Sequence, residues 1–530
     1  STSPTDSVTF ESAGGDSTQA ILQYNSTNAD SNYVVRLDGE SNLTFRGMTL
    51  KATGDDYGRV VELKRGSHNN RFLNNILEST AGESTTVKAL VFSSDNTPAM
   101  DTMNLFRDNV FKSGSYGIFM NGMDQSGQEY GNRIIDNRFS NQSAYAIYMR
   151  YQDEPVIRGN VVQAAPDNIY YGMYLEDSYS SLDISKNKLN INGTGNGYGI
   201  FLQNSDAESG NTGMVANNFV RVNTAGSTYG IRTNSQYQDI FYNSINVTGN
   251  STSSAALYAD GVNSSFKNNS FVNQAGGYAF EITTSTGDDI DYNNYYTTGS
   301  YPVRADGTDY TGIEDWRAAN PGYNSAYLTD NPPYTSESDL HLLVSELDSS
   351  GTSISGIDED IDGEIRDATH PDIGADEFDA YQFDLGDDVV ACYGDSVTLD
   401  AGAGFDSYLW STGATTQSIK IGYGDLSSEV EYFKATITIG DFELADSLAV
   451  TYYHPVADAG SDTTACHGGN LTLDAGTSLD CEWYHESLGM IGQSAQVTHT
   501  FDDPQYDGVD QYEIEFVLRV TEGNCEDYDT

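Results

Sequence analysis

The sequence predicts an all-β protein whose main part is a parallel β-helix, a solenoid in which every turn of the chain adds one strand to each sheet. A strand of one form recurs from YGIFM at 116–120 to YAFEI at 278–282. Between its copies a second strand recurs that is built on Asn, at intervals of 23 to 31 residues. No helical pattern separates them, and parallel strands need the crossover that a coil supplies. We therefore predict about ten coils, each rising about 4.8 Å above the last.

The Asn residues of the second strand are predicted to face the interior. Charged residues at the alternate positions, such as Arg138 and Lys188, must face water, so Asn137 and Asn187 point inward. A buried amide needs hydrogen-bond partners. Stacked Asn side chains can bond to one another and to the turn backbone. The predicted ladder comprises Asn109, Asn137, Asn160, Asn187, Asn218, Asn243, Asn269 and Asn294, and Asn75 extends it upstream.

The same alternation separates inside from outside in the strands of the YGIFM form. Arg232 in YGIRT and Glu281 in YAFEI mark the outward positions, because charged side chains are rarely buried. The residues predicted to face the core are Ile118, Met120, Ile147, Met149, Met173, Leu175, Ile200, Leu202, Ile231 and Ile282.

The outward positions of these strands form what we term the aromatic strip. It comprises Phe119, Tyr148, Tyr174, Phe201, Arg232 and Tyr258. Gly or Ala stands two positions before each member, and we expect these small residues to leave a flat groove beside the rings. Sugar rings or another protein could occupy such a groove. In the alternative interpretation, the rings stack on one another and add only cross-strand stability.

The composition limits the partners and the location of the protein. It has 78 Asp and Glu against 25 Lys and Arg, a net charge of −53, which disfavours nucleic acid and anionic membranes and favours divalent cations. The sequence contains no run of 18 apolar residues, so we expect no membrane-spanning segment in it. All four cysteines follow residue 390, as expected of an exported, extracellular protein. With no initiator Met or signal peptide, we expect a part of a longer, processed chain.

Changes of pattern divide the chain into four predicted parts. Residues 1–305 form the β-helix, with residues 1–40 forming its first coil and the cover over that coil, and residues 306–380 form a cap at the other end. An open sheet end without a cover would expose unpaired strands. Residues 381–454 and 455–530 form two further domains, the second continuing into the longer chain.

These two C-terminal parts repeat one another. The sequence ACYGDSVTLDAG at 391–402 returns as ACHGGNLTLDAG at 465–476, and Trp410 is matched by Trp483. Short alternating strands with a Trp after the first two strands are typical of an immunoglobulin-like (Ig-like) β-sandwich. We therefore predict two Ig-like domains.

Three segments resemble known families. The period and the Asn ladder resemble those of pectate-lyase-like β-helices, which implies a right-handed coil. DIDG at 360–363, with Arg366 and DIGADE at 372–377, resembles the closing segment of β-helix proteins that gliding-type bacteria export by type IX secretion. YLWSTGATTQSI at 408–419 resembles the PKD-like and Ig-like repeats of surface proteins exported by the same system. These resemblances imply a cell-surface adhesin with its cap at the DIDG segment and its sandwiches as spacers.

The resemblance to these repeats also implies a disulfide. An early Cys pairs there with a late one, which corresponds to Cys466 and Cys525 here. Pairing of Cys481 with Cys525 stays open, because Cys481 lies on the same face of its strand as Trp483. Cys392 is then expected to be an unpaired thiol that faces the core.

The acidic stretch at 358–379 offers a candidate metal site. Asp358, Asp360 and Asp362, followed by Gly363, have the spacing that opens a calcium loop, although its twelfth position is Thr369 instead of Glu. Calcium is therefore a possible cofactor. An equally good interpretation is that Arg366 pairs with Asp372 or Glu377 and locks the cap.

We predict a non-enzymatic adhesin or structural segment of a surface appendage. Its partner would be a carbohydrate or a protein on another surface, and copies could assemble into the appendage. The alternative is a polysaccharide-binding or polysaccharide-degrading module, a lyase or a glycoside hydrolase. For that chemistry Asp288 and Asp289 lack a supporting His or Arg motif, and Arg138 and Arg158 are scattered surface charges. The predicted β-helix contains a single histidine, His68.

Overall fold

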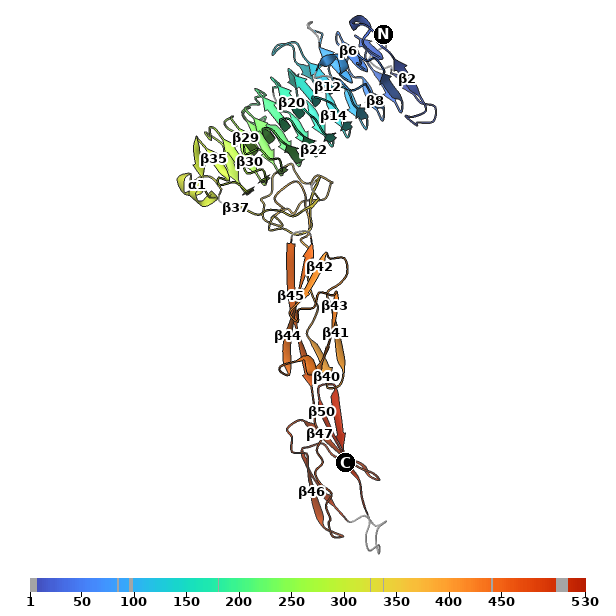
Figure 1. Ribbon diagram of the computed structural model, residues 1–530, viewed down its shortest axis with the longest axis vertical. Coiled ribbons are helices and arrows are strands. Elements are labelled where there is room, and N and C mark those ends of the chain that lie inside the picture. The colour runs from blue at the N-terminus through green and yellow to red at the C-terminus, as the bar shows by residue number, and fades with distance from the viewer. Residues whose placement is uncertain are drawn as a thin grey trace. The chain divides into compact units, whose positions relative to one another are not determined.

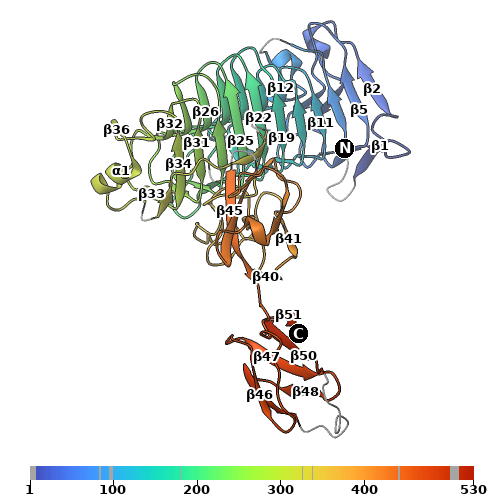
Figure 2. The same cartoon turned by 60° about the horizontal axis from the view of Figure 1, so that its bottom comes forward.

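The chain divides after Ala380 into two units, Ser1–Ala380 and Tyr381–Thr530, in the computed structural model (Figures 1 and 2). The structure describes residues 7–82, 85–94, 99–179, 181–324, 326–336, 338–439, 442–501 and 513–530. Each unit has its own hydrophobic core.

The first unit is a parallel β-helix with three long sheets. Its first sheet has 11 strands, which all pair in parallel with the equivalent strand of the next coil. In spatial order they are β1 (Val8–Glu11), β4 (Leu43–Arg46), β7 (Arg71–Leu73), β10 (Leu105–Arg107), β14 (Arg133–Ile135), β18 (Val156–Arg158), β21 (Asp183–Ser185), β24 (Gly213–Ala216), β27 (Gln238–Phe241), β30 (Ser265–Lys267) and β33 (Asp289–Asp291).

The second sheet has 12 strands and follows the first in every coil. Its strands are β2 (Ile21–Tyr24), β5 (Thr49–Ala52), β8 (Ile76–Glu78), β11 (Val110–Lys112), β15 (Arg138–Ser140), β19 (Val161–Ala164), β22 (Lys188–Gly193), β25 (Phe219–Thr224), β28 (Ser244–Val247), β31 (Ser270–Asn273), β34 (Asn293–Thr297) and β37 (Tyr327–Leu328).

The third sheet also has 12 strands and contains the YGIFM-type segments. Its strands are β3 (Val35–Asp38), β6 (Val61–Lys64), β9 (Val91–Ser94), β12 (Tyr116–Asn121), β16 (Tyr145–Arg150), β20 (Tyr170–Glu176), β23 (Gly197–Gln203), β26 (Thr228–Thr233), β29 (Ser254–Ala259), β32 (Tyr278–Ile282), β35 (Val303–Ala305) and β36 (Thr308–Tyr310). The last pair, β35 and β36, is antiparallel. Shorter elements at the turns are β13 (Glu129–Tyr130), β17 (Gln152–Asp153), and the 3-10 turns η1 (Ala29–Ser31) and η2 (Thr86–Lys88).

The core of the solenoid is closed and apolar. All ten side chains predicted to face it are fully buried, which confirms the alternation argument for the third sheet. Inside the first sheet, Phe45, Phe72 and Phe106 stack from coil to coil with ring centroids 5.1 and 5.0 Å apart. Because equivalent residues pair in register, each coil completes the core of the next.

The Asn ladder runs along the turn between the first and second sheets. At each rung the Asn Oδ1 accepts from the backbone N–H and the side-chain amide of the preceding Asn; Asn160 does so from Asn137 at 3.0 Å for both bonds. The series is confirmed from Asn75 to Asn269.

The predicted last rung, Asn294, is wrong by one residue. Asn269 donates its backbone N–H to Asn293 at 2.9 Å, whereas the amide of Asn294 donates to the backbone oxygen of Asp330. Each rung directly follows a turn residue with positive φ, and in the last coil that residue is Tyr292 (φ 54°). The left-handed turn, and not the Asn-Asn dipeptide, therefore sets the register.

A second, shorter ladder went unrecognised in the sequence. It consists of Asn70, Asn104 and Asn132, which lie at the turn before the first sheet. The backbone N–H of Asn70 donates to Asn104 Oδ1 at 3.1 Å, and the backbone N–H of Asn104 donates to Asn132 Oδ1 at 3.0 Å. These residues lie five positions before rungs of the first ladder. An Asn pair flanking each three-residue strand was the available signal.

The two ends of the solenoid differ from the prediction. Described residues 7–40 form the first coil, as predicted, but not the predicted cover over it, since Phe10 and Ile21 of that coil are 46% and 59% exposed. At the other end, helix α1 (Ile313–Ala319) closes the core with its buried Trp316, whose ring lies 5.6 Å from that of Phe280.

The segment with DIDG and DIGADE does not cap the end of the solenoid, contrary to the prediction. It follows the hairpin β38 (Tyr334–Ser336) and β39 (Asp339–Leu342) and lies against the flank, at the corner between the first and second sheets. The backbone N–H of Ala375 donates to Ser244 Oγ at 2.9 Å, and Arg366 donates to Asn217 Oδ1 at 2.8 Å. Asn217 and Ser244 belong to the eighth and ninth coils, so the acidic segment packs against the side of the solenoid and not against its end.

The second unit contains small, mostly antiparallel sheets around two buried tryptophans, Trp410 and Trp483. The first set comprises β40 (Val389–Cys392), β41 (Ser396–Asp400), β42 (Ser407–Trp410), β43 (Ser418–Gly422), η3 (Tyr423–Asp425), β44 (Val430–Ile439) and β45 (Phe442–Tyr453). The second comprises β46 (Asn470–Asp474), β47 (Asp480–His485), β48 (Gly489–Gly492), β49 (Gln496–Thr500), β50 (Phe516–Glu522) and β51 (Cys525–Asp529).

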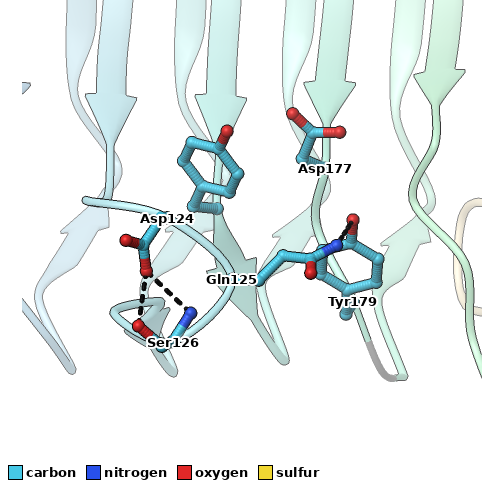
Figure 3. A pocket seen from close by; sticks show the side chains of 6 residues that line it. Asp124, Gln125, Ser126, Asp177 and Tyr179 are labelled. Carbon is cyan, nitrogen blue, oxygen red and sulfur yellow. Dashed lines mark hydrogen bonds between the residues drawn. The ribbon is translucent and has the colours of Figure 1, made fainter.

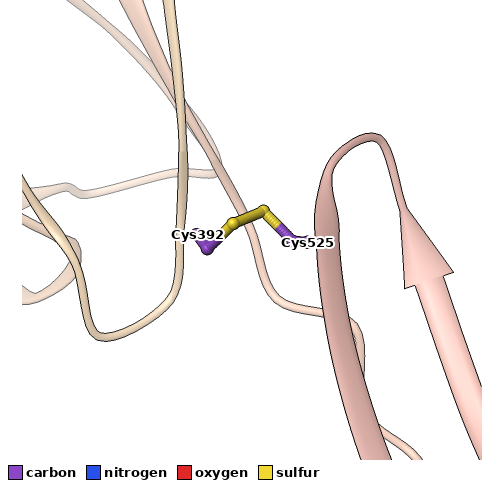
Figure 4. Close-up of a disulfide and its surroundings, with 2 residues drawn as sticks. All are labelled: Cys392 and Cys525. Atoms are coloured by element: carbon purple, nitrogen blue, oxygen red, sulfur yellow. A yellow bond between two sulfur atoms is a disulfide. The ribbon is translucent and has the colours of Figure 1, made fainter.

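A disulfide joins these two sets of strands, and it is not the one predicted. Cys392 at the end of β40 is bonded to Cys525 at the start of β51, with Cα atoms 5.3 Å apart (Figure 4). Cys466 is an exposed thiol and Cys481 a buried one that donates to the backbone oxygen of Leu479. The predicted Cys466–Cys525 bridge, its Cys481 alternative and the unpaired Cys392 are therefore wrong.

Contact between the two repeats explains this pairing. Cys392 pairs in register with Tyr453, and the ring of Tyr453 packs against Gly523 in the turn before Cys525. The bridge therefore connects the first set of strands to the second. The sequence repeat compares the two sets with each other and gives no information about contacts between them.

Candidate functional site

The aromatic strip forms one continuous column on the outer face of the third sheet. The ring centroids of Phe119 and Tyr148 lie 4.8 Å apart, those of Tyr148 and Tyr174 5.4 Å, and those of Tyr174 and Phe201 5.1 Å. The guanidinium of Arg232 then lies 5.0 Å from the rings of both Phe201 and Tyr258. The structure thus brings together all six residues that the sequence singled out.

A second column of rings runs beside the first and was missed in the sequence. It comprises Tyr116, Tyr145, Tyr171, Tyr198 and Tyr229, whose successive centroids lie 4.8, 4.7, 4.6 and 5.4 Å apart. We call the two columns together the aromatic band. The signal was the Tyr that begins each YGIFM-type strand.

The small residues between the columns face the core, so the predicted groove is wrong. A Cβ on Gly199 would lie 2.3 Å from Val220 Cγ1, and one on Gly230 would lie 2.2 Å from Ile245 Cγ2. The Gly or Ala position is left out of the strand pairing: Tyr116 pairs with Tyr145, and the next pair is Ile118 with Ile147. Gly and Ala are needed there because the interior has no room for a larger side chain, and the surface beside the strip is filled by tyrosines.

The rings of the band are half-buried except for Phe201, which is buried, and most cover one another face to face. Outward they present ring edges and hydroxyl groups. Burial raises the pKa of Tyr145 and Tyr148, so their hydroxyls remain protonated and can donate hydrogen bonds. The Tyr148 hydroxyl donates to Glu176 Oε2 at 2.8 Å, and the Tyr174 hydroxyl donates to Gln203 Oε1 at 2.7 Å.

A polar pocket of about 370 Å³ lies at the end of the strands that carry the band (Figure 3). Its lining residues are Asp124, Gln125, Ser126, Tyr151, Asp177 and Tyr179. Tyr151 and Asp177 directly follow β16 and β20, and the other wall is a loop that leaves the coil after β12. Arg150, the last residue of β16, connects the pocket to the band. Its Nη2 lies 2.8 Å from Asp177 Oδ2, and its guanidinium carbon lies 4.5 Å from the centre of the Tyr151 ring.

The residues considered for catalysis do not converge. Asp288 is buried and accepts from the backbone N–H of Ser264 at 2.8 Å, whereas the exposed Asp289 pairs with Lys267 at 2.5 Å. Arg158 is paired with Asp183. The two neighbouring carboxylates thus lie on opposite sides of the sheet, which does not match the facing acid pair of a glycoside hydrolase.

Burial raises the pKa of Asp288 from 3.8 to about 7, and its Oδ2 has no hydrogen-bond partner among the described residues. The folded state therefore holds a proton that the unfolded state releases above about pH 4, so stability falls as pH rises towards 7. Asp288→Asn should leave stability unchanged near pH 4 and raise it by about 1–3 kcal/mol at pH 8, since one pKa unit corresponds to about 1.4 kcal/mol before relaxation. Urea unfolding at both pH values measures this difference. Asp289→Asn is the matched control, and an equal gain in both variants would contradict the assignment.

The predicted calcium loop is not formed. The Asp360 carboxylate is fully buried, and its Oδ1 accepts from the backbone N–H groups of Asp362, Gly363 and Glu364 at 2.8–2.9 Å. Its Oδ2 accepts from the backbone N–H of Glu377. These bonds fold the turn and leave Asp358, Asp360 and Asp362 without a common centre.

The predicted ion pair of Arg366 with Glu377 is confirmed, but it holds a segment on the flank and not a cap. The buried guanidinium of Arg366 lies 2.9 Å from Glu377 Oε2 and 3.9 Å from the ring of Tyr242. Arg366 therefore ties the acidic segment both to itself and to the solenoid. Asp372 does not pair with Arg366; its Oδ2 accepts from the backbone N–H of Phe378 at 2.7 Å.

Comparison with known proteins gives one family. Residues 14–206 and 77–255 match the family model described as periplasmic copper-binding protein (NosD). No curated protein matches the chain significantly. In the part of the chain that the structure describes, no helix is long and apolar enough to cross a membrane. The family match covers under half of the chain and falls on the regular coils, so sequence and structure agree on a parallel β-helix similar to that of an exported, periplasmic family.

Proposed function

We propose that this chain is a non-enzymatic segment of an exported surface protein, adhesive or structural, that binds a carbohydrate or a protein of another surface through the aromatic band. The observation that carries the proposal is the double column of mostly half-buried rings, with Arg232 stacked between Phe201 and Tyr258, on an otherwise acidic protein. Large aromatic patches at a surface are typical of binding sites, and Tyr combines an apolar ring with a polar tip. Cross-strand stacking alone would also stabilise the sheet, but it does not require hydroxyl groups at the surface.

Within this proposal a neutral carbohydrate is the favoured ligand. The pocket beside the band combines two Tyr rings with the carboxylates of Asp124 and Asp177 and the amide of Gln125. Aromatic surface with a few oriented polar groups is the usual composition of a small-ligand site. An acidic glycan would be repelled by these carboxylates and by the net charge of −53.

Copper binding does not extend to this chain from the family description. Copper sites use imidazole, thiolate or thioether ligands. Residues 14–255 contain one histidine, His68, and no cysteine. Of their eight methionines, Met120, Met149 and Met173 are fully buried in the core, whereas Met103 is 48% exposed. The residues in the matched region therefore do not supply a histidine or cysteine ligand set.

The second unit and the segments with DIDG and YLWSTG also fit a surface protein. The two Trp-centred sets of strands would act as Ig-like or PKD-like spacers, and export by type IX secretion would follow from the resemblance of the DIDG and YLWSTG segments. Copies of the chain could assemble within an appendage. These roles are proposals of the same kind as the ligand.

Replacing both Tyr148 and Tyr174 by Ser is expected to abolish binding, because it breaks the band beside the pocket. The measurement is binding of the full chain to an array of neutral and acidic glycans, with a pull-down against surface proteins. The control replaces Tyr130 and Tyr301 by Ser; both are exposed and lie outside the band. Thermal melts check folding, since each lost ring pair should cost only about 0.2–1 kcal/mol.

Three outcomes would contradict the proposal. Equal binding by the band variant and the control would remove the band as the contact surface. A preference for acidic over neutral glycans would remove the argument from charge. Cleavage of any bound polysaccharide, measured as the release of new reducing ends, would show that the protein is an enzyme and not only an adhesin.

A further inference from the structure

We propose that His341, Asp362 and Asp376 bind a divalent transition-metal ion, for which Zn²⁺ is the best-fitting probe. The site lies on the flank of the solenoid, far in sequence from the aromatic band, and does not depend on the function proposed above. One ligand atom from each of the three side chains lies within 4.8 Å of the other two.

Three separate pieces of chain position these ligands. His341 lies on β39, Asp362 follows the turn folded by Asp360, and Asp376 belongs to the DIGADE segment. The backbone N–H of Leu342 donates to Asp376 Oδ2 at 2.8 Å, which fixes this carboxylate beside His341. The ring of Phe219 on β25 packs edge-on against the His341 imidazole at 4.8 Å and restricts its rotation.

Asp376 is the most enclosed of the three proposed ligands and has one carboxylate oxygen available to a metal ion. Its side chain is only 6% exposed, and one of its carboxylate oxygens accepts the bond from Leu342. The other oxygen accepts no hydrogen bond from any residue that the structure describes. A carboxylate oxygen without a hydrogen-bond donor from the protein is free to take a cation or a water molecule, and the ligand atoms of His341 and Asp362 lie within 4.8 Å of that of Asp376.

The imidazole has the orientation expected of a metal ligand. Its Nδ1 bonds to the carboxylate of Asp339, and its Nε2 hydrogen-bonds to Asp362 Oδ2 at 2.5 Å; a metal ion would replace the proton in this second bond and move the two atoms apart. In metal sites a carboxylate commonly holds one ring nitrogen of His, so that the other presents its lone pair to the ion. Asp339 is thus the positioning residue, and Nε2, Asp362 and Asp376 are the ligands.

Ligand type and charge favour zinc over calcium. Calcium takes six to eight oxygen ligands, whereas zinc accepts His and Asp in a four-coordinate site and can leave one position for water. Three carboxylates, from Asp339, Asp362 and Asp376, surround the site. Lys188 Nζ lies 2.8 Å from Asp362 Oδ1, so this lysine and a divalent ion would together balance the three negative charges.

Such an ion would clamp the flanking segment in place. It would join β39 to both parts of the acidic segment, which already share a small apolar cluster with Phe219 of the solenoid. We therefore expect the metal to stabilise the attachment of this segment to the solenoid.

Zinc titration of the purified full chain by calorimetry tests the proposal. We expect one site of higher affinity above the weak binding of the acidic surface. His341→Gln and Asp376→Asn should each abolish it, and Asp339→Asn should weaken it about 10–100-fold. The control is His370→Gln, which removes an exposed histidine of the same segment. Substitution with Co²⁺ gives a second readout, since four-coordinate cobalt with a nitrogen ligand has strong visible absorption bands.

Two results would overturn the proposal. The first is zinc isotherms and cobalt spectra that are the same for His341→Gln, His370→Gln and the parent chain. The second is a melting temperature that changes with pH in the parent chain but not in His341→Gln, and that neither zinc nor EDTA alters. That result would show that a proton on His341, and not a metal ion, lies between the carboxylates. Titrations with Mn²⁺, Cu²⁺ and Ca²⁺ separate the metals, and tighter binding of Ca²⁺ than of Zn²⁺ would also refute the choice of ion.

Discussion

Asn160→Ala is expected to destabilise the solenoid by about 3–5 kcal/mol, the largest effect that we predict for a single side chain. Asn160 accepts two hydrogen bonds from Asn137 and donates to the backbone oxygen of Ile134 and to Asn187 Oδ1 at 2.8 and 3.0 Å. All four groups are fully enclosed, so the substitution leaves several buried donors and acceptors unpaired. Each unpaired group costs about 1–3 kcal/mol.

Urea unfolding of the full chain, followed by far-ultraviolet circular dichroism, measures this loss. The matched control is Asn223→Ala, because Asn223 makes a similar Asn–Asn bond to Asn192 Oδ1 at 2.9 Å on the surface. We expect the control to lose less than about 0.5 kcal/mol. Equal losses in the two variants would show that the ladder adds no more than an exposed amide pair.

Removal of the Cys392–Cys525 disulfide is expected to cost the second unit about 2–5 kcal/mol. The bridge closes a loop with a sequence separation of 133 residues, and cross-links over long loops restrict the unfolded chain most. It also holds together two small sets of strands, whose separate cores are limited in size. Cys392→Ser and Cys525→Ser should therefore lower the melting temperature of residues 381–530 by similar amounts.

Cys466→Ser is the discriminating control for this prediction. Cys466 is an exposed thiol in the structure, so its replacement should leave the melting temperature unchanged. If Cys466 were the partner of Cys525, as the repeat pattern implied, Cys466→Ser would be as damaging as Cys525→Ser and Cys392→Ser would be harmless. Peptide mapping under non-reducing conditions gives the pairing directly.

Features that repeat from coil to coil were predictable from the sequence. The inward position of Ile118, Ile147 and Met173 followed from charged residues at alternate positions, and all three are fully buried. The ladder from Asn109 to Asn269 followed from the same argument. Such predictions succeed because every coil repeats the same local choice, so an error in one coil conflicts with its neighbours.

Failures occurred where the pattern changes or where distant segments meet. The strip of Gly and Ala seemed to lie outside because two-residue alternation was assumed to continue through YGIFM, but the register skips one position there. Asn294 was chosen over Asn293 because the sequence does not show which residue takes the left-handed turn. His341 was not considered at all, since its partners Asp362 and Asp376 are 21 and 35 residues away from it.

The sequence by itself determined the solenoid, its inward residues and the aromatic strip, because strand alternation and a repeat of 23 to 31 residues are local properties of the chain. Only the tertiary structure decided the docking of the acidic segment on the flank, the His341 cluster and the disulfide partner of Cys525. Each of these depends on which surfaces meet after the coils have formed, and that is set by packing between segments whose separation in sequence follows no period.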